Sequence, residues 1–339
     1  MSVDRGSIIL LGHGGGGKMT GRLVRDTILP RLNRGKLGPL PDSVVLDGLG
    51  GRIAYTTDSY TVSPIFFPGG NIGSLAIHGT CNDLACSGAR PAFLSVGLIL
   101  EEGLTMAELN SILDSMSEAA DEAEVEIVTG DTKVVPRGGA DKIFINTSGI
   151  GKIEHNFNFG HHTVEVGDEI IVSGSVGNHG MAIMLSRAEF SFDFHIESDS
   201  ASIWPLVRRL LELGPNLKFL RDPTRGGLAA TLNEIASGSS VEIVVEETSI
   251  PIDSEVRAAS EILGIDPLLA ANEGKLVAVV KKGMGQRAVS LLSECEPAGN
   301  AQIIGVIASN TAKRVIMNTA IGGSRILAEP TGELLPRIC

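Results

Sequence analysis

The stretch His78-Gly79-Thr80-Cys81-Asn82-Asp83-Leu84-Ala85 lies inside residues 71–87, which contain a predicted helix. Leu46–Asp58 and Ser63–Phe67 precede this helix as predicted strand segments, and Ala92–Leu100 follows it as a strand of the buried type. Further along the chain, helices and strands are mixed without the strict alternation of a single parallel sheet. The sequence therefore predicts the α+β class.

Two domains and a tail are expected from the length and the local composition. At 339 residues with 43% hydrophobic content, the chain is long enough for two domains that each have a core. The polar stretch 155–167 has no clear period and predicts a junction. We expect an N-terminal domain over 1–155 and a C-terminal αβ domain over 156–328. Residues 329–339 contain two prolines and a glycine, which predict a mobile, flexible tail.

The charge and the apolar runs exclude several classes of function. A net charge of -12 repels a phosphate backbone, and no cluster of Lys and Arg interleaved with aromatic residues offsets it. We therefore expect no nucleic-acid partner. No run of eighteen apolar residues and no signal-peptide pattern occurs, so we expect no membrane association and a cytoplasmic location. The four cysteines form no CxxC pair, which argues against a zinc site or a disulfide framework.

A glycine run over residues 12–17 precedes a predicted helix over Lys18–Leu32. The run partly matches both the phosphate-loop and the dinucleotide-binding templates, but any glycine run does so. The phosphate loop needs Ser or Thr where Met19 stands, and residues 37–40 contain no acidic residue for a ribose. What remains is a loop rich in backbone N–H groups, which can close over phosphates without being either motif.

Aspartates at polar strand ends and loops are the candidate ligands for a metal. Asp58, Asp83 and Asp131 lie in the short polar segments 55–59, 80–84 and 129–133. Asp222 lies in the segment Arg221-Asp222-Pro223-Thr224-Arg225-Gly226-Gly227, which starts a predicted helix. Each aspartate alone is typical of a turn or a helix cap. Together they indicate a Mg²⁺ site, because Mg²⁺ prefers carboxylate oxygens.

The last residue, Cys339, places a thiol at the tip of the predicted tail. A cysteine at this position is either a nucleophile carried by a mobile arm or a small apolar side chain that packs against the protein. Its own α-carboxylate should raise the pKa of the thiol, so we expect activation to come from elsewhere.

Five motifs, in this order along the chain, resemble one superfamily. They are Thr57-Asp58, Asn82-Asp83-Leu84-Ala85, Gly130-Asp131-Thr132-Lys133, Asp222-Pro223-Thr224-Arg225-Gly226-Gly227 and Asn272-Glu273-Gly274. This set resembles the ATP-dependent superfamily of aminoimidazole ribonucleotide synthetase, selenophosphate synthetase and thiamine-monophosphate kinase. The glycine run, residues 78–85 and the ending Pro336-Arg337-Ile338-Cys339 are similar to the HypE family of hydrogenase maturation factors.

The resemblance implies a reaction and a set of roles. HypE proteins receive a carbamoyl group on the C-terminal cysteine from the carbamoyltransferase HypF and dehydrate it with ATP to a thiocyanate. The cyano group then passes to iron on the HypC–HypD complex, for [NiFe] hydrogenases. By this resemblance Asp58, Asp83 and Asp131 hold Mg²⁺, and these residues with Asn82 and Asp222 bind ATP. Cys339, Lys133 and Glu273 are the catalytic candidates, with Glu273 as the base.

The resemblance also implies a homodimer formed through the N-terminal domain. Two other functions stay open at this point: an ATP-dependent small-molecule synthetase or kinase of the same superfamily, and a non-catalytic carrier or scaffold. Neither alternative needs a reactive terminal thiol, so the fate of Cys339 distinguishes them from the dehydratase.

Overall fold

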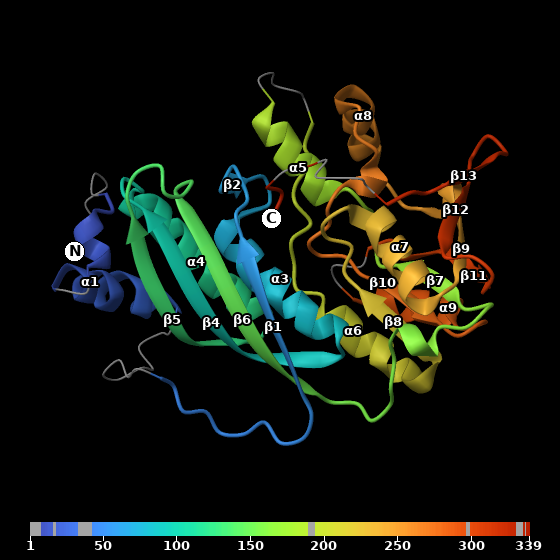
Figure 1. The fold of residues 1–339 in the computed structure, drawn as a ribbon, viewed down its shortest axis with the longest axis horizontal. Coiled ribbons are helices and arrows are strands. Elements are labelled where there is room, and N and C mark those ends of the chain that lie inside the picture. The colour runs from blue at the N-terminus through green and yellow to red at the C-terminus, as the bar shows by residue number, and fades with distance from the viewer. Residues whose placement is uncertain are drawn as a thin grey trace.

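The computed structural model describes residues 8–15, 18–32, 43–188, 194–295, 299–329, 335 and 337–339. Two αβ domains lie beside each other, and the C-terminus lies between them (Figure 1). The first domain contains α1 Lys18–Leu23, α2 Leu29–Leu32, β1 Ile53–Tyr60, β2 Phe66–Phe67, β3 Gly70–Asn71, α3 Ile72–Cys86, β4 Ala89–Glu101, α4 Met106–Glu122, β5 Glu126–Val135 and β6 Ile143–Ile153. The second contains β7 Glu169–Val172, α5 Asn178–Arg187, α6 Trp204–Leu210, β8 Leu217–Arg221, α7 Gly227–Ser239, β9 Glu242–Glu246, α8 Ser254–Leu263, β10 Val277–Val280, α9 Gly285–Ser293, β11 Gln302–Ser309, β12 Arg314–Asn318 and β13 Ser324–Ile326. The mixture of helices and strands confirms the α+β prediction.

The N-terminal domain is built on a four-stranded sheet with the order β1-β6-β4-β5. β1 and β4 pair antiparallel with β6, whereas β4 and β5 are parallel. Helices α3 and α4 cover one face of this sheet (Figure 1). Along β1 the alternate residues 54, 56, 58 and 60 face the helices, and residues 53, 55, 57 and 59 are exposed on the outer face. Asp58 therefore points toward α3.

Helix α3 confirms the helix predicted over residues 71–87. Asn71 caps it by accepting a hydrogen bond from the Gly73 N–H at 2.8 Å. Gly79 lets the helix lie close to β1, because a Cβ at this position would lie 2.3 Å from the Tyr60 hydroxyl oxygen. This close approach brings Asp83 beside Thr56 of β1.

The C-terminal domain has a seven-stranded sheet with the order β13-β12-β9-β11-β7-β10-β8. One side of the sheet packs against α7 through Leu228 and Leu232, and the other packs against α6 and α9. The second of these apolar clusters also contains Ala85 from α3, so it continues across the domain boundary. The two domains therefore pack against each other through α3.

The chain leaves the first sheet at Ile153 and enters the second at Glu169, so the expected junction falls between the two sheets. The predicted strand over Leu46–Asp58 begins later than expected, at Ile53. The predicted helix over Lys18–Leu32 is present, with a π-helical turn at Val24–Ile28 between α1 and α2. Across the described ranges, no helix combines the length and apolarity that a membrane crossing requires.

Candidate active site

Asp58 and Asp83 form the centre of a carboxylate cluster between the two domains. Asp58 comes from β1 and accepts a hydrogen bond from the Thr80 hydroxyl at 3.2 Å. Asp83 comes from α3 and accepts one from the Thr56 hydroxyl at 2.9 Å. Burial, followed by the charge of Asp83, raises the pKa of Asp58 to about 6. The structure therefore brings these two candidate ligands together.

Asp222 joins this cluster from the loop that precedes α7. Its side chain is buried, and the Cys86 thiol lies 3.9 Å from its Oδ1. Gly226 and Gly227 follow with φ angles of 77° and 61°, a conformation that glycine adopts without strain. Burial and then the charge of Asp83 raise the pKa of Asp222 to about 7.

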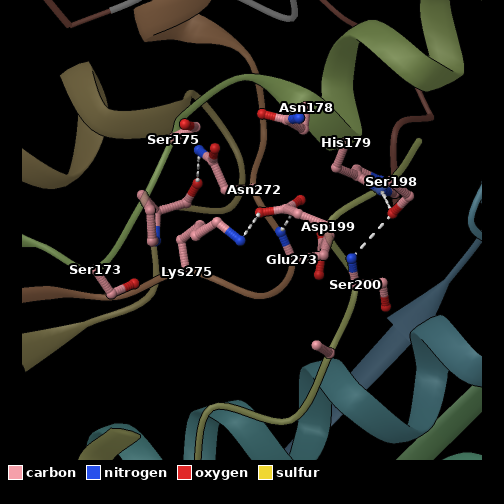
Figure 2. A network of polar contacts seen from close by, with 12 residues as sticks. Ser173, Ser175, Asn178, His179, Ser198, Asp199, Ser200, Asn272, Glu273 and Lys275 are labelled. Carbon is pink, nitrogen blue, oxygen red and sulfur yellow. Dashed lines mark hydrogen bonds and ion pairs between the residues drawn. The ribbon is translucent and has the colours of Figure 1, made fainter. Parts of the chain in front are cut away.

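Glu273 supplies the fourth carboxyl group and is 3% exposed. Its backbone N–H donates to Asp199 Oδ1 at 3.1 Å, and Asp199 in turn lies 3.6 Å from the Lys275 ammonium group (Figure 2). Among the described residues, the Glu273 Oε1 has no hydrogen-bond partner. Burial raises the pKa of Glu273 well above its usual value, and the charge of Asp222 is the next cause. Its environment therefore favours taking up and holding a proton.

Asn82 positions Glu273 rather than offering a free group to a nucleotide. Its amide nitrogen donates to the backbone oxygens of Glu273 and Ala201 at 2.9 and 3.0 Å, and its oxygen accepts from the Ile203 N–H at 2.9 Å. The residue is 1% exposed. Because both amide hydrogens and the oxygen bind protein backbone, this side chain ties α3 to the loops of the second domain.

The end of the tail is docked between the two domains. The Thr61 N–H donates to the Cys339 backbone oxygen at 3.1 Å, and the Ser63 N–H donates to the Arg337 oxygen at 3.2 Å. Arg337 also binds back to the first domain, since its Nε donates to the Thr61 oxygen at 2.9 Å and its guanidinium pairs with Asp141 at 2.8 Å. The predicted arm thus has a defined docking position.

Helix α5 of the second domain supplies the other half of the docking site. His179 Nε2 donates to the Ile338 oxygen at 2.8 Å, and His179 Nδ1 lies 2.8 Å from the Ser198 hydroxyl (Figure 2). Burial lowers the pKa of His179, which favours the neutral ring that carries its proton on Nε2. Arg187 donates to the backbone oxygens of Ser63 and Arg337, both at 2.6 Å. These contacts recognise the tail through its backbone.

Cys339 lines a cavity of about 440 Å³ together with Ser59, Arg225 and Ala271. Burial raises the pKa of its thiol to about 12, and the charge of Glu273 is the next cause. The sequence predicts a raised thiol pKa from the α-carboxylate, whereas the leading causes in the structure are burial and Glu273. The docked thiol is therefore protonated near neutral pH.

Asp131 and Lys133 lie apart from the cluster in this chain. In the sheet register, Asp131 is opposite Gly97, Gly97 is opposite Asn146, and Asn146 is opposite Ser59. Neighbouring strands are about 4.8 Å apart, so Asp131 lies roughly 14 Å from Ser59. Both Asp131 and Lys133 are exposed. One chain alone does not unite Asp131 with Asp58 and Asp83, because β6 and β4 separate β5 from β1.

The carboxylate oxygens of this site suit a hard cation that a substrate also coordinates. In the part of the chain that the structure describes, no three His, Cys, Asp or Glu side chains are arranged to hold a metal ion by themselves. Mg²⁺ in nucleotide sites takes one or two carboxylates and completes its shell with phosphate and water. Asp58 and Asp83 supply such a pair, and their mutual repulsion, seen in the raised pKa of Asp58, is what a cation would relieve.

Three residues of the site carry roles that the sequence did not reveal. His179 and Arg187 bind the tail, and Arg225 faces the cavity that contains Cys339. Arg225 lies within the motif of residues 222–227, and no other feature of the sequence marks it as a site residue. No local pattern marks His179 or Arg187, because their partners in the tail are backbone oxygens 159 and 150 residues away in the sequence.

Comparison with known proteins agrees with this arrangement. The sequence matches the families described as AIR synthase related protein, N-terminal domain, over residues 41–153 and AIR synthase related protein, C-terminal domain, over residues 165–318. The carbamoyl dehydratase HypE of Rhizobium leguminosarum bv. viciae is 47% identical over 331 residues, which cover 97% of this chain and 94% of that protein.

Two solved structures are similar over most of the chain. A crystal structure of the hydrogenase maturation protein HypE in complex with ATP matches with a TM-score of 0.92 and 48% identity, covering 97% of this chain and 99% of that one. A chain from a HypE–HypF complex matches with a TM-score of 0.80 and 47% identity, covering 83% and 92%.

The chain therefore belongs to the AIR synthase related superfamily of two-domain αβ proteins. Within that superfamily it is a member of the HypE family. The resemblance found in the sequence motifs is thus confirmed.

Asn82→Ala should lower the free energy of unfolding by about 3 kcal/mol, because it leaves two buried carbonyl oxygens and one buried N–H without partners. Urea denaturation followed by circular dichroism measures this loss. Asn156→Ala, at an exposed position of the junction, is the control and should change stability by less than about 0.5 kcal/mol. Equal stability of the two variants would contradict the role given to Asn82.

Arg187→Gln should increase the rate at which iodoacetamide alkylates Cys339 at pH 8 by about tenfold, because the charge-assisted hydrogen bond to the Arg337 oxygen of the tail is lost, together with the one to Ser63 that positions Arg187. A docked thiol with a pKa of about 12 is almost wholly protonated at pH 8, whereas an undocked one near its usual value of about 8.5 is partly ionised. The wild-type rate should therefore rise steeply from pH 7 to 10.

Mass spectrometry of the C-terminal peptide measures this reaction. Arg325→Gln, which removes a surface ion pair with Asp266, is the matched control and should leave the rate unchanged. If Arg187→Gln reacts no faster than this control, the tail is not held by Arg187.

Proposed function

We propose that this chain uses ATP to dehydrate a carbamoyl group on Cys339 to a thiocyanate, as a step in hydrogenase maturation. The observation that carries the proposal is the docking of Cys339 into a cavity where its buried thiol feels the charges of the Glu273, Asp58 and Asp222 carboxyl groups. A carbamoyl group carried on this thiol would lie inside the site without any diffusing substrate. Neither a small-molecule kinase nor a scaffold requires that geometry.

The chemistry needs an activated oxygen and a base. An amide oxygen is a poor leaving group, so the carbamoyl oxygen first attacks the γ-phosphorus of ATP and ADP departs. Loss of two N–H protons and cleavage of the C–O bond then give the nitrile and inorganic phosphate. Phosphoryl transfer depends mainly on positioning and charge neutralisation, which a rigid cleft between two domains supplies.

Asp58 and Asp83 would hold Mg²⁺ for the ATP phosphates. Asp222 would be a further polar side chain of the same site. When bound, this cation would neutralise charge on the transferring phosphoryl group. It would also weaken the repulsion that raises the pKa of Asp58 and Glu273. Proton uptake by Glu273 would then depend on a loaded nucleotide site.

Glu273 is the proposed base for the nitrogen protons. Its carboxyl group is buried, its Oε1 lacks a partner among the described residues, and its charge acts on the Cys339 thiol. Asn82 and Asp199 hold its backbone from both sides, which fixes the direction of the side chain. A base inside such an apolar setting accepts a proton readily.

Asp131 and Lys133 would enter the site in a homodimer. β1 and β5 are the two edges of the four-stranded sheet, so a second chain can place its β5 beside β1. The outer face of this sheet exposes apolar side chains, with Tyr55 68%, Ile53 56% and Ile99 40% exposed. This surface supports a proposed pairing of two copies, in which Lys133 faces the phosphates of the other chain.

The proposed partners follow the same chemistry. The HypE chain that is similar to this one has been solved in a complex with HypF, which supports HypF as the carbamoyl donor here. The HypC–HypD complex would receive the cyano group. Such an exchange among maturation factors is expected in the cytoplasm.

Incubation with the carbamoyltransferase and then with ATP and Mg²⁺ should add one carbamoyl group to the C-terminal peptide and afterwards remove one water. Intact-mass and peptide mass spectrometry follow both steps. Cys339→Ala should lose both steps yet still bind ATP, because the thiol is the acceptor. A carbamoyl adduct that never loses water with ATP would refute the proposed dehydration.

Glu273→Gln should keep carbamoylation but slow the water loss by about 10²–10⁴-fold, because the amide cannot take up the nitrogen protons. Single-turnover mass spectrometry measures this rate. The matched control is Glu234→Gln, a partly exposed residue at the rim of the same cavity, which should slow the reaction less than threefold. Full activity of Glu273→Gln would assign the base to another group.

A further inference from the structure

Arg225 is a charged residue for which the docked structure offers no partner. It lies on the loop between Asp222 and α7 and lines the cavity that contains Cys339. Its side chain is exposed, and within the described part of the chain it makes no hydrogen bond or ion pair. An arginine without a partner beside a reaction cavity is poised to bind a ligand.

The charged groups around Cys339 determine what the positive charge of Arg225 can stabilise. Glu273, Asp58 and Asp222 all raise the pKa of the Cys339 thiol, and Arg225 is the one cation among its principal influences, lowering that pKa. Two other arginines contact the docked tail, but Arg337 binds Asp141 and Arg187 binds the backbone oxygens of Ser63 and Arg337. Arg225 is therefore the cation available to an anion that forms at the tip of the tail.

The α-carboxylate of Cys339 makes no ion pair with Arg225 among the described residues, and the sulfur of the docked tail supplies no anion. The docked thiol is protonated, with a pKa of about 12, and a carbamoyl group on sulfur is uncharged. The thiol must also leave the cavity to receive its carbamoyl group, because a protonated, buried thiol is a poor nucleophile. The charge of Arg225 is thus used after the carbamoylated tail has returned.

We propose that Arg225 binds the phosphoryl group once it is on the carbamoyl oxygen, and holds it as the C–O bond breaks and phosphate leaves. The inference rests on the proposed dehydration and adds a catalytic residue to it. A planar guanidinium donates two parallel hydrogen bonds to phosphate oxygens, which a lysine cannot reproduce. Arg225 would face this group from the tail side, opposite the cation held by Asp58 and Asp83.

The step balances without any further reactant. S-carbamoyl-Cys339 and ATP give the O-phosphorylated intermediate and ADP, with a new O–P bond formed as the γ-phosphate bond of ATP breaks. Glu273 then takes one nitrogen proton, the departing phosphate carries away the other, and the C–O electron pair goes to oxygen, which gives S-cyano-Cys339 and inorganic phosphate. Arg225 neutralises the charge that collects on the phosphate oxygens and takes no proton itself.

The backbone around Arg225 fixes its position. Gly226 and Gly227 both have positive φ angles, and a Cβ on Gly227 would lie 2.5 Å from the Ala270 oxygen. The loop is thereby packed against the segment that leads to Glu273. Arg225 and the proposed base thus sit on neighbouring, tightly packed backbone, which holds them at a constant separation.

The test uses the full chain, carbamoylated by its transferase and then mixed with ATP and Mg²⁺ in a single turnover. Arg225→Gln should accept the carbamoyl group at the wild-type rate but lose water about 10²–10³-fold more slowly, as for removal of one donor to a developing anion. The KM for ATP should change by less than threefold. Arg225→Lys should recover only part of the rate, and added ethylguanidine should restore part of it in Arg225→Gln.

Three results separate the explanations. A structural role for Arg225 would give no rescue by ethylguanidine, which would overturn the proposal. Water loss by Arg225→Gln within threefold of wild type would overturn it as well. Arg208→Gln, an exposed arginine on α6, is the matched control and should keep the wild-type rate. If the wild-type chain itself loses no water, the proposed dehydration fails, and that outcome differs from any defect confined to Arg225.

Discussion

The side-chain amide of Asn82 is the contact on which the site depends. It leaves α3 of the first domain and binds the backbone of Ala201, Ile203 and Glu273 in the second. Because Asp83 is the next residue, the same turn of helix that locks the domains together also aims a carboxylate into the cleft between them. Any rotation of one domain against the other would break three hydrogen bonds, two of them buried and one partly buried. The cleft is thus held at one width, as phosphoryl transfer requires.

The carboxylate cluster is held in place against its own repulsion. Asp58 and Asp222 have pKa values raised to about 6 and about 7, and burial raises the pKa of Glu273 well above its usual value. A carboxyl group whose pKa is raised by folding favours the fold below its unfolded pKa, and this contribution is lost as the pH passes through the folded value. At neutral pH these carboxyl groups therefore lower the free energy of unfolding of the free protein. Binding of a cation and a nucleotide would restore this stability, so ligand binding and folding are coupled.

Much of the fold and half of the site could be predicted from the sequence. Helix α3 carries a continuous apolar pattern with a cap at Asn71, and the polar segments around Asp58, Asp83 and Asp222 stand out against apolar surroundings. Strand order is not a local property, however. Asp131 is in a segment like that of Asp58, yet two strands inserted between β1 and β5 keep the residues apart. Asn82 has the residue type of a metal or nucleotide ligand, and only its distant backbone partners show that its hydrogen-bonding groups are used.

The docked tail explains why the chemistry of Cys339 requires two positions. Inside the cavity, burial and Glu273 keep the thiol protonated, which protects it but prevents it from attacking a carbamoyl donor. The hydrogen bonds that hold the tail run to the backbone of Arg337, Ile338 and Cys339 and from the side chain of Arg337, so these contacts do not depend on what the sulfur carries. A thiol, a carbamoyl adduct and a cyano adduct can therefore dock with the same geometry. Recognition through the backbone therefore suits one docking site to every chemical state of the Cys339 sulfur.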